Sequence, residues 1–405
     1  MTYPDTYALA AAATAAYSQP LHSHRPPSST YLPPALYLCD LSTVARQVHT
    51  FRTLLPGITP YYAVKCNSDA VLLSFLARLH VSFDVASSHE ISLISTLVPA
   101  PLSARTIFAN PFKAPSELSY ARSHGIDLVT VDAVDEVHKV ALHHPLARVL
   151  LRIAVDDSDS ACPLSSKFGA LASEVAAILA AVRGSDATLV GVAFHVGSGC
   201  RDAAAYTRAL GAARRVFDAA RDAGLPRLSV LDIGGGFPGR DGANGAAAFA
   251  DIASGVRQGV QELFDADTQV IAEPGRYFVA TAYTLAVQVV QTGRRDGARW
   301  CVVADGVHGS FRDAWLLDQE FQASAAGDVQ GDLAEWEVRG ASRAAGDAIA
   351  NRCMLPCGLA QGDWVRFADM GAYTMCLATR VGGAGRHQVA YYYSGRGSAA
   401  ADDGG

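Results

Sequence analysis

Eight short apolar segments alternate with helix-like stretches between residues 42 and 275, and this alternation limits the possible folds more than any other feature. The segments are rich in β-branched and aromatic residues and lie at 61–65, 81–87, 104–110, 127–132, 147–154, 189–197, 228–234 and 269–273. Strands separated by helices predict a parallel sheet, and eight strands match a closed (β/α)8 barrel, a TIM-like α/β fold. An open doubly wound sheet is the alternative. It is disfavoured because its glycine cluster follows the first strand, whereas here the cluster follows the seventh.

The chain changes character after Arg276. Segments such as "YTLAVQVVQTG", "RWCVVADG" and "HQVAYYYSG" predict strands joined by turns, with a helix expected only near residues 343–352. We therefore predict a barrel domain over residues 41–280 and a second, mainly β domain, sandwich- or barrel-like, built from residues 1–40 and 281–395. Residues 396–405 are small and polar, which predicts a disordered tail.

Composition argues against several classes of protein. The formal net charge is -6, so no basic surface indicates nucleic acid or membrane binding. No apolar run reaches the length of a membrane span, and the alanine-rich segment "ALAAAATAA" follows Asp5 rather than the basic residues of a secretory signal, so we expect a cytoplasmic protein. The eight cysteines are scattered, and Cys353 and Cys357 lack the further ligands of a zinc site. We expect reduced, mostly structural cysteines and no metal.

Polar and glycine residues collect where the predicted barrel strands end, which is where such barrels place their chemistry. These residues are Lys65, Asp84, Arg152, His195, Ser198, the triplet Gly234-Gly235-Gly236, Glu273, Gly275 and Arg276. Lysine is rare in this chain, since arginine fills most basic positions, and only the lysine amine can form a Schiff base with an aldehyde.

The other strand-end residues complete a recognisable set. Backbone N–H groups of the glycine triplet, together with Gly275 and Arg276, can cradle a phosphate. A carboxylate such as Glu273 can hold a proton on a pyridine nitrogen, and an imidazole such as His195 can stack on the ring. An aldehyde, a phosphate and a pyridine ring together describe pyridoxal 5'-phosphate (PLP).

Each feature also has an ordinary structural explanation when taken alone. A strand-end lysine is usually a solvated charge, and "GGGFPG" alone could be only a tight turn. A single histidine is usually a satisfied polar residue, and a glutamate before Pro-Gly can be a cap. The joint occurrence of all these features at the same end of predicted strands favours the cofactor site.

Longer motifs carry a resemblance over residues 35–395. In chain order they are "YAVKCN", "FDVAS" with Glu90, "LRIAVDDSDSACPLSSKFGA", "HVGSGC", "DIGGGFPG", "EPGRYFVA", "DGVHGSF" and "GDWVRFADMGAYT". The chain thereby closely resembles the ornithine decarboxylase family of fold-type III PLP enzymes. The resemblance implies a PLP-dependent carboxy-lyase that acts on an amino acid and forms a homodimer with two shared active sites.

The resemblance also implies individual roles. Lys65 corresponds to the cofactor lysine, Glu273 to the partner of the pyridine nitrogen, and His195 to the residue that stacks on the ring. The phosphate-binding set corresponds to Ser198, Gly235, Gly236, Gly275, Arg276 and Tyr373. The polar layer around the lysine and the ring corresponds to Asp84, Glu90 and Arg152.

The chain departs from the family on the substrate side. The family's second subunit contributes a loop with Cys-Asp and, three residues later, a further Asp, whereas this loop reads "GASRAAGDAI". Arg343 and Ala344 replace the Cys-Asp pair, while Asp347 remains to pair with Lys167 across the dimer. Further substrate-side differences are His308 for a tyrosine and Val381-Gly382 for Phe-Asn, and Asp318 remains as a diamine-binding carboxylate.

These replacements predict an unusual substrate. One carboxylate for a terminal ammonium is lost, and a guanidinium at Arg343 would repel a cationic side chain. Arginine suits a carboxylate, so we expect an amino acid whose far end carries a carboxylate or a neutral group. The ordinary explanation is that Arg343 faces solvent or pairs with an acidic neighbour at the dimer contact.

Loss of the family cysteine leaves the proton donor open. Protonation at Cα gives an amine, whereas protonation at the cofactor carbon or reaction with oxygen gives a carbonyl product, so an oxidase or transaminase is one alternative. Cys200, Cys357, His308 and a water are the possible donors. Two further alternatives are a non-catalytic, decarboxylase-like regulator and an ordinary ornithine decarboxylase.

Overall fold

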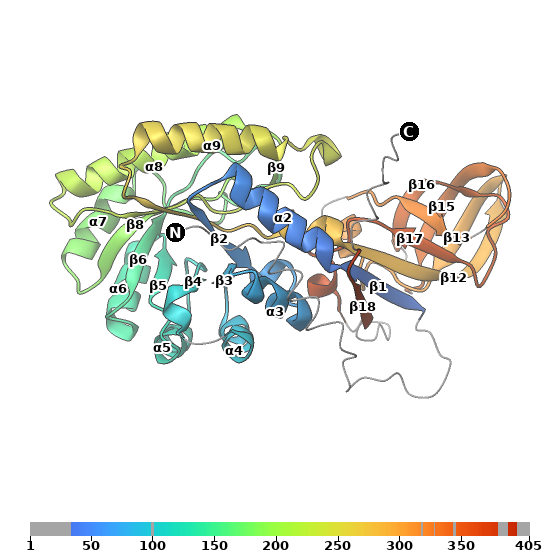
Figure 1. Ribbon diagram of the computed structural model, residues 1–405, viewed down its shortest axis with the longest axis horizontal. Coiled ribbons are helices and arrows are strands. Elements are labelled where there is room, and N and C mark those ends of the chain that lie inside the picture. Colours follow the sequence, from blue (N-terminus) through green and yellow to red (C-terminus); the bar gives the residue numbers. More distant parts are fainter. Residues whose placement is uncertain are drawn as a thin grey trace, which may run out of the picture. The chain divides into compact units, whose positions relative to one another are not determined.

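A computed structural model of the protein describes residues 34–98, 101–316, 319–327, 329–342, 346–379 and 388–394. The chain divides into two compact units (Figure 1). One is the continuous segment Val48–Tyr277, and the other combines the residues before and after it. No helix within the described ranges is long and apolar enough to cross a membrane.

Unit Val48–Tyr277 contains a closed barrel of eight parallel strands, which confirms the predicted fold. The strands are β2 (Ile58–Ala63), β3 (Ser82–Val85), β4 (Thr106–Phe108), β5 (Leu128–Val131), β6 (Arg148–Arg152), β8 (Thr188–Ala193), β10 (Val230–Asp232) and β11 (Gln269–Ala272). Around the barrel they follow the order β10-β11-β2-β3-β4-β5-β6-β8. A short antiparallel ribbon of β7 (Ser160–Cys162) and β9 (Ser198–Cys200) is added beside it.

The barrel interior is a packed core rather than a channel. It contains side chains from successive strands, among them Tyr61, Ile107, Leu128, Leu150, Val230 and Ile271. Strands β8 and β10 approach so closely at Gly191 that a Cβ there would lie 1.9 Å from the carbonyl oxygen of Val230. Parallel strands buried on both faces give nearly continuous apolar runs, which is why the sequence pattern identified all eight.

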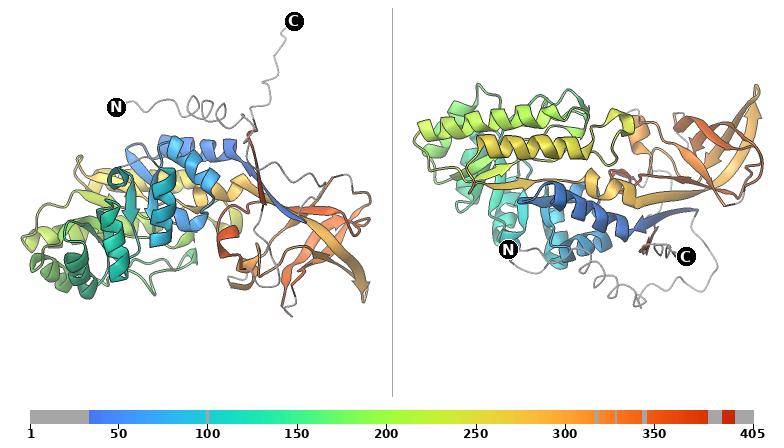
Figure 2. Two further views of the ribbon diagram at one scale, coloured as in Figure 1. Left: turned by 90° about the horizontal axis from the view of Figure 1, so that it is seen from below. Right: turned by 45° about the horizontal axis from the view of Figure 1, so that its top comes forward.

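Helices cover the outside of the ring of strands (Figure 1). They are α2 (Leu41–Leu54), α3 (Ala70–Arg78), α4 (Ser88–Leu97), α5 (Pro115–Ser123), α6 (Val134–His143), α7 (Val175–Arg183), α8 (Ala204–Asp222) and α9 (Phe249–Leu263). The two longest of these around the barrel, α8 and α9, run side by side along it (Figure 2). Short helical turns follow strands and connect elements: η1 (Val64–Cys66), η2 (Leu102–Ala104), η3 (Ala243–Gly245) and α10 (Arg276–Val279).

The second unit is mainly β, as predicted for the second domain, and most strand pairs of its sheet are antiparallel. Its strands are β1 (Ala35–Asp40), β12 (Tyr283–Arg295), β13 (Ala298–Val303), β14 (Ala323–Ala326), β15 (Leu333–Gly340), β16 (Ala348–Pro356), β17 (Trp364–Phe367) and β18 (Gln388–Tyr392). Strand β12 organises the sheet because it pairs with β1, β13 and β17. The short helices are η4 (Ala280–Ala282), α11 (Arg312–Leu316) and η5 (Met375–Leu377).

The helix predicted near residues 343–352 is wrong for the residues that the structure describes there. Residues 348–352 belong to β16, which pairs antiparallel with β15 over most of its length. The segment is rich in alanine, which favours a helix locally, but sheet pairing outweighs that weak preference.

All eight cysteines lie within the described ranges and are reduced thiols rather than disulfides, and five of them are buried. Cys353 is buried inside the sheet and Cys357 is exposed, so the two do not form a shared site.

Candidate active site

Six neighbouring barrel strands bring polar side chains together at their carboxyl ends. In order around the barrel these strands are β3, β2, β11, β10, β8 and β6. Their ends, or the residues directly after them, carry Asp84, Lys65, Glu273, Asp232, His195 and Arg152 in the same order. We call these six residues the polar arc. Closure of the barrel therefore unites residues that are far apart in the sequence.

Lys65 lies in the helical turn η1, just beyond β2, rather than in the strand itself. Its Nζ forms an ion pair with Oδ2 of Asp84. The Asp84 side chain is fully buried, whereas the Lys65 side chain is 42% exposed. Oδ1 of Asp84 is buried without a hydrogen-bond partner among the described residues. The Lys65 amine therefore lies at the barrel mouth beside Asp84, whose Oδ1 can still accept a hydrogen bond.

Glu90 supports the turn after β3. Its Oε2 accepts a 2.6 Å hydrogen bond from the backbone N–H of Ala86, and its own N–H donates to Oγ of Ser87. Burial raises the pKa of Glu90, and the nearby Asp84 carboxylate adds to this effect. Glu90 therefore shapes the start of α4 next to the polar arc.

His195 is held as a neutral ring. Its Nδ1 accepts a 3.0 Å hydrogen bond from the N–H of Gly197, which assigns the ring proton to Nε2. Burial lowers the pKa of His195 well below its usual value, and the positive charges of Arg152 and Lys65 lower it further. A neutral imidazole of this kind can stack on an aromatic ring without adding charge.

The glycine loop after β10 is held from two sides. Tyr206, fully buried on α8, donates a 2.9 Å hydrogen bond to the carbonyl oxygen of Gly235, and Cys200 N–H donates to that of Gly236. Gly234 and Gly236 have φ angles of +63° and +107°, which favour glycine. The loop is therefore rigid and has no side chains of its own.

Arg276 faces Ser198 at the neighbouring loop. Its Nε and Nη2 lie 3.4 and 3.5 Å from the Ser198 hydroxyl oxygen. The preceding Gly275 packs closely, since a Cβ there would lie 3.0 Å from Cβ of Cys66. A guanidinium and a hydroxyl in contact, beside a glycine loop, form a binding site suited to a phosphate.

These residues fit PLP. Lys65 offers an amine, Glu273 offers a buried carboxyl, and the glycine loop with Arg276 offers anion donors. The buried Oδ1 of Asp84, which lacks a partner among the described residues, indicates that the site is built for a further polar group.

The remaining predicted residues lie in the second unit or outside the described ranges. Tyr373 has a φ angle of +56°, a strained conformation for a tyrosine. His308 packs edge-on against Trp315, with ring centroids 6.2 Å apart. Four predicted residues fall outside the described residues: Asp318, Arg343, Ala344 and Val381, together with its neighbour Gly382.

The two predicted dimer-contact residues have partners within their own chain. Asp347 is buried, and its Oδ1 and Oδ2 accept hydrogen bonds from the N–H groups of Val307 and Ser342. Lys167 Nζ lies 5.2 Å from the centre of the Phe168 ring. Asp347 thereby ties together two loops of the second unit, and its pairing with Lys167 of another subunit stays a prediction.

Two residues of the candidate site, Asp232 and Tyr206, were not among those predicted from the sequence. Asp232 is fully buried at the end of β10, and its Oδ1 accepts a 2.8 Å hydrogen bond from Gly234 N–H. A carboxylate two residues before a glycine triplet at a strand end was a signal available in the sequence. Tyr206 gave no such signal, because its position on α8 matches an ordinary core residue.

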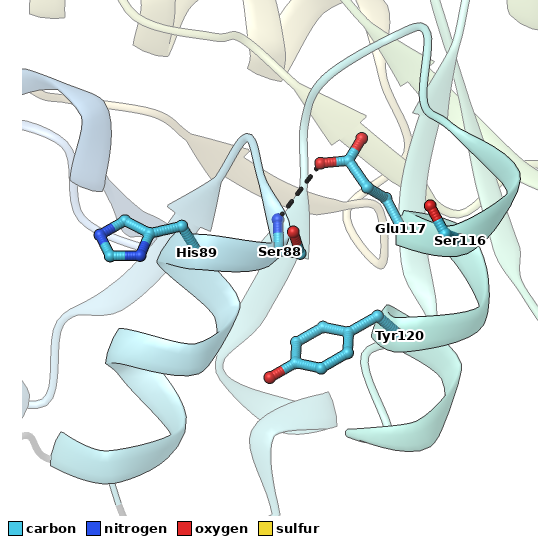
Figure 3. A pocket seen from close by; sticks show the side chains of 5 residues that line it. All are labelled: Ser88, His89, Ser116, Glu117 and Tyr120. Carbon is cyan, nitrogen blue, oxygen red and sulfur yellow. Dashed lines mark hydrogen bonds between the residues drawn. The ribbon is translucent and has the colours of Figure 1, made fainter.

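A separate hollow of about 400 Å³ lies between the first turns of α4 and α5 (Figure 3). It is lined by Ser88, His89, Ser116, Glu117 and Tyr120. The Glu117 carboxylate already accepts hydrogen bonds from the N–H groups of Ser88 and Ala114. The hollow contains no residue of the polar arc, and we assign it no part in the chemistry.

Comparison with known proteins agrees with this geometry. Residues 41–280 match the family described as pyridoxal-dependent decarboxylase, pyridoxal binding domain. The chain is 37% identical to ornithine decarboxylase of Rattus norvegicus over 378 residues, which cover 89% of this chain and 81% of that protein. It is also 37% identical to antizyme inhibitor 2 of Xenopus laevis over 374 residues, covering 88% and 80%.

A solved structure, the arginine decarboxylase of Paramecium bursaria Chlorella virus, superposes with a TM-score of 0.84 at 31% identity and covers 89% of this chain and 96% of its own. The family match spans the barrel and every residue of the polar arc. The chain therefore belongs to the pyridoxal-dependent decarboxylases, carboxy-lyases whose cofactor is pyridoxal 5'-phosphate.

Proposed function

We propose that this decarboxylase acts on an amino acid whose far end carries a carboxylate or a neutral group, rather than on ornithine or lysine. The observation that carries the proposal is the pair Arg343-Ala344, which stands where the family has Cys-Asp. A guanidinium about 4 Å from a substrate ammonium would oppose binding by about 4 kcal/mol near a protein surface. The same guanidinium would bind a carboxylate through two parallel hydrogen bonds.

Described residues next to the substrate-side positions lie close to one another, which supports the proposal that these positions line one surface. Asp347 binds Val307 and Ser342, so the segment before residue 343 lies against the loop that carries His308. The N–H of Thr379, close before Val381, donates a 2.8 Å hydrogen bond to the His308 carbonyl oxygen. Two stretches of chain, near residues 342–347 and 379, therefore meet at the 305–310 loop, which supports placing the substrate-side positions together.

The residues of the polar arc have distinct tasks in the reaction. Bound PLP supplies an aldehyde and an electron-withdrawing ring that stabilises the carbanion left when CO₂ departs. Lys65 would hold the aldehyde end, with its amine positioned by Asp84. Glu273 would hold the proton on the ring nitrogen, and neutral His195 would cover the ring face. Arg276, Ser198 and the glycine loop would hold the phosphate.

The group that delivers the final proton decides the product. The family's cysteine is replaced by Arg343, and an arginine does not give up its proton. His308, in the 305–310 loop beside the substrate-side segments, carries an imidazole, a common general acid in enzymes. Protonation at the substrate carbon gives an amine, and failure of this step would favour the carbonyl product of an oxidase or transaminase.

Exchange of both substrate-side residues tests the proposed specificity. We expect the double variant Arg343→Cys/Ala344→Asp to gain putrescine formation from ornithine by at least about tenfold, since repulsion is removed and a carboxylate is restored. Chromatographic detection of putrescine measures the gain. The matched control Arg343→Ala removes the repulsion alone and should gain less. A wild-type chain that decarboxylates ornithine as well as the double variant would refute the proposal.

We also propose a homodimer in which Lys167 pairs with Asp347 of the partner subunit. Asp347→Asn should lower the free energy of unfolding by about 1–3 kcal/mol, because the new amide N–H faces a backbone N–H. Lys167→Ala should leave unfolding unchanged and weaken only subunit association. Denaturant unfolding and analytical ultracentrifugation separate the two effects. An unchanged dimer dissociation constant in Lys167→Ala would argue against the pairing.

A non-catalytic regulator is the second candidate, favoured by the similarity to antizyme inhibitor 2. Retention of Lys65, Glu273, Arg276 and the glycine triplet weighs against it, since a regulator without cofactor has no use for that set. Cofactor binding together with CO₂ release from any amino acid would exclude this candidate.

A further inference from the structure

Two buried carboxyl groups meet at the centre of the polar arc. Asp232 ends β10 and Glu273 follows β11, and these two strands are paired neighbours in the barrel. Asp232 is fully buried and Glu273 is 9% exposed. No N–H or O–H of the described residues reaches Oδ2 of Asp232, so this buried oxygen lacks a donor beside the neighbouring strand that leads to Glu273. Two carboxyl groups can hydrogen-bond each other only when one of them carries a proton.

The charged groups around Asp232 and Glu273 also favour a proton on one of these two carboxyl groups. The groups that act on Asp232 and Glu273 are the negative Asp84, the positive Lys65 and Arg152, and the phenol of Tyr61. In the cofactor-free site three carboxyl groups face two cations, which leaves one negative charge in excess, and one shared proton removes it. Burial raises the pKa of Asp232 to about 7, and burial together with the Asp232 charge raises the pKa of Glu273 well above its usual value.

We propose that Asp232 is a positioning residue that stays protonated when the cofactor is bound and donates its O–H to the Glu273 carboxylate. Its Oδ1 is fixed by the N–H of Gly234, so only Oδ2 can carry the proton toward Glu273. The bond fixes the rotation of the Glu273 carboxyl and leaves its other oxygen for the ring nitrogen. The inference rests on assigning Glu273 to that nitrogen and does not depend on the substrate.

An asparagine at position 232 reproduces the proposed state. The amide oxygen can accept the Gly234 N–H, and the amide nitrogen can donate to Glu273, as the protonated aspartate would. We expect Asp232→Asn to bind PLP within about threefold of the wild-type affinity at pH 7. Asp232→Leu keeps similar bulk without a donor and should bind at least about tenfold more weakly, because a charged hydrogen bond is lost.

The pH dependence of cofactor binding gives the decisive measurement. Wild-type protein must hold a proton on Asp232 to bind, so its PLP dissociation constant should rise more steeply with pH above 7 than that of Asp232→Asn, by about one logarithmic unit per pH unit. Absorbance titration of cofactor-free protein at pH 6 to 9 measures both slopes. Asp132→Asn is the matched control, since Asp132 accepts a backbone N–H at the end of β5, outside the polar arc.

Unfolding of the cofactor-free protein supplies an independent readout. A carboxyl whose folded pKa is raised stabilises the fold below its unfolded pKa near 4 and loses that contribution as pH rises to about 7. The melting temperature of Asp232→Asn minus that of wild type should therefore increase between pH 5 and 8. Equal weakening of PLP binding in the Asn and Leu variants, or parallel pH slopes for Asn and wild type, would overturn the proposal. If Asp232→Leu does not fold, the slope comparison still decides.

Discussion

Replacing Lys65 with arginine is expected to reduce decarboxylation by at least roughly 10³-fold, which corresponds to about 4 kcal/mol of activation free energy. Arginine keeps the positive charge beside the buried Asp84, so the ion pair and the fold should survive. A guanidinium does not react as an amine with the cofactor aldehyde. The visible band of lysine-bound cofactor should therefore be absent, while the melting temperature stays near that of wild type.

Lys139→Arg is the control for the lysine replacement. Lys139 is paired with Glu136 on α6, outside the polar arc, and its replacement also keeps the charge. CO₂ release and the absorption spectrum should match wild type. Activity in Lys65→Arg comparable to that of this control would show that Lys65 does not bond the cofactor.

Gly235→Ala should strongly weaken cofactor binding and should also lower the free energy of unfolding. A Cβ at this position would lie 2.7 Å from the carbonyl oxygen of Glu273 and 2.9 Å from Nε2 of His195. Backbone cannot yield as a flexible side chain does, so we expect a loss of about 1–3 kcal/mol in the free energy of unfolding. Displacement of the glycine loop should weaken PLP binding by at least about 100-fold, measured by absorbance titration.

Gly211→Ala is the matched control for the glycine replacement. Gly211 lies inside α8, where a Cβ would meet only the tip of Arg215 at 3.9 Å. Alanine favours a helix over glycine by about 1 kcal/mol, so this variant should be slightly more stable and bind PLP normally. Tight cofactor binding by Gly235→Ala would contradict the close approach at the loop.

The barrel was predictable because its strands are buried on both faces. Runs such as "ARVLLRI" and "ATLVGVAF" are apolar without alternation, and each of the eight predicted runs overlaps a barrel strand. The second unit was predictable for the opposite reason, since β12 alternates buried and partly exposed positions over its first half. The segment "GDAIAN" was wrongly predicted as helical. Its last residues form part of β16, because pairing with β15 decides their conformation.

The candidate cofactor residues could be named from the sequence because they belong to specific motifs at strand ends. The contacts among these residues could not be predicted, since the order of the strands around the barrel (β3, β2, β11, β10, β8 and β6) depends on barrel closure. Asp232 was therefore overlooked beside its glycine loop, although its strand β10 is paired with β11, the strand that leads to Glu273. Likewise, the sequence showed that Asp347 remains, but not that both its oxygens accept N–H groups within its own chain.

The most direct test is to mix purified protein with PLP, record the visible spectrum, and then measure CO₂ release from single amino acids. The panel should contain ornithine, lysine, arginine and analogues whose far end is neutral or carries a carboxylate. The account predicts a visible band from lysine-bound cofactor, and CO₂ release that is fastest with one of the analogues. No band at saturating PLP, or no CO₂ from any amino acid, would contradict the assignment of this chain as a working decarboxylase.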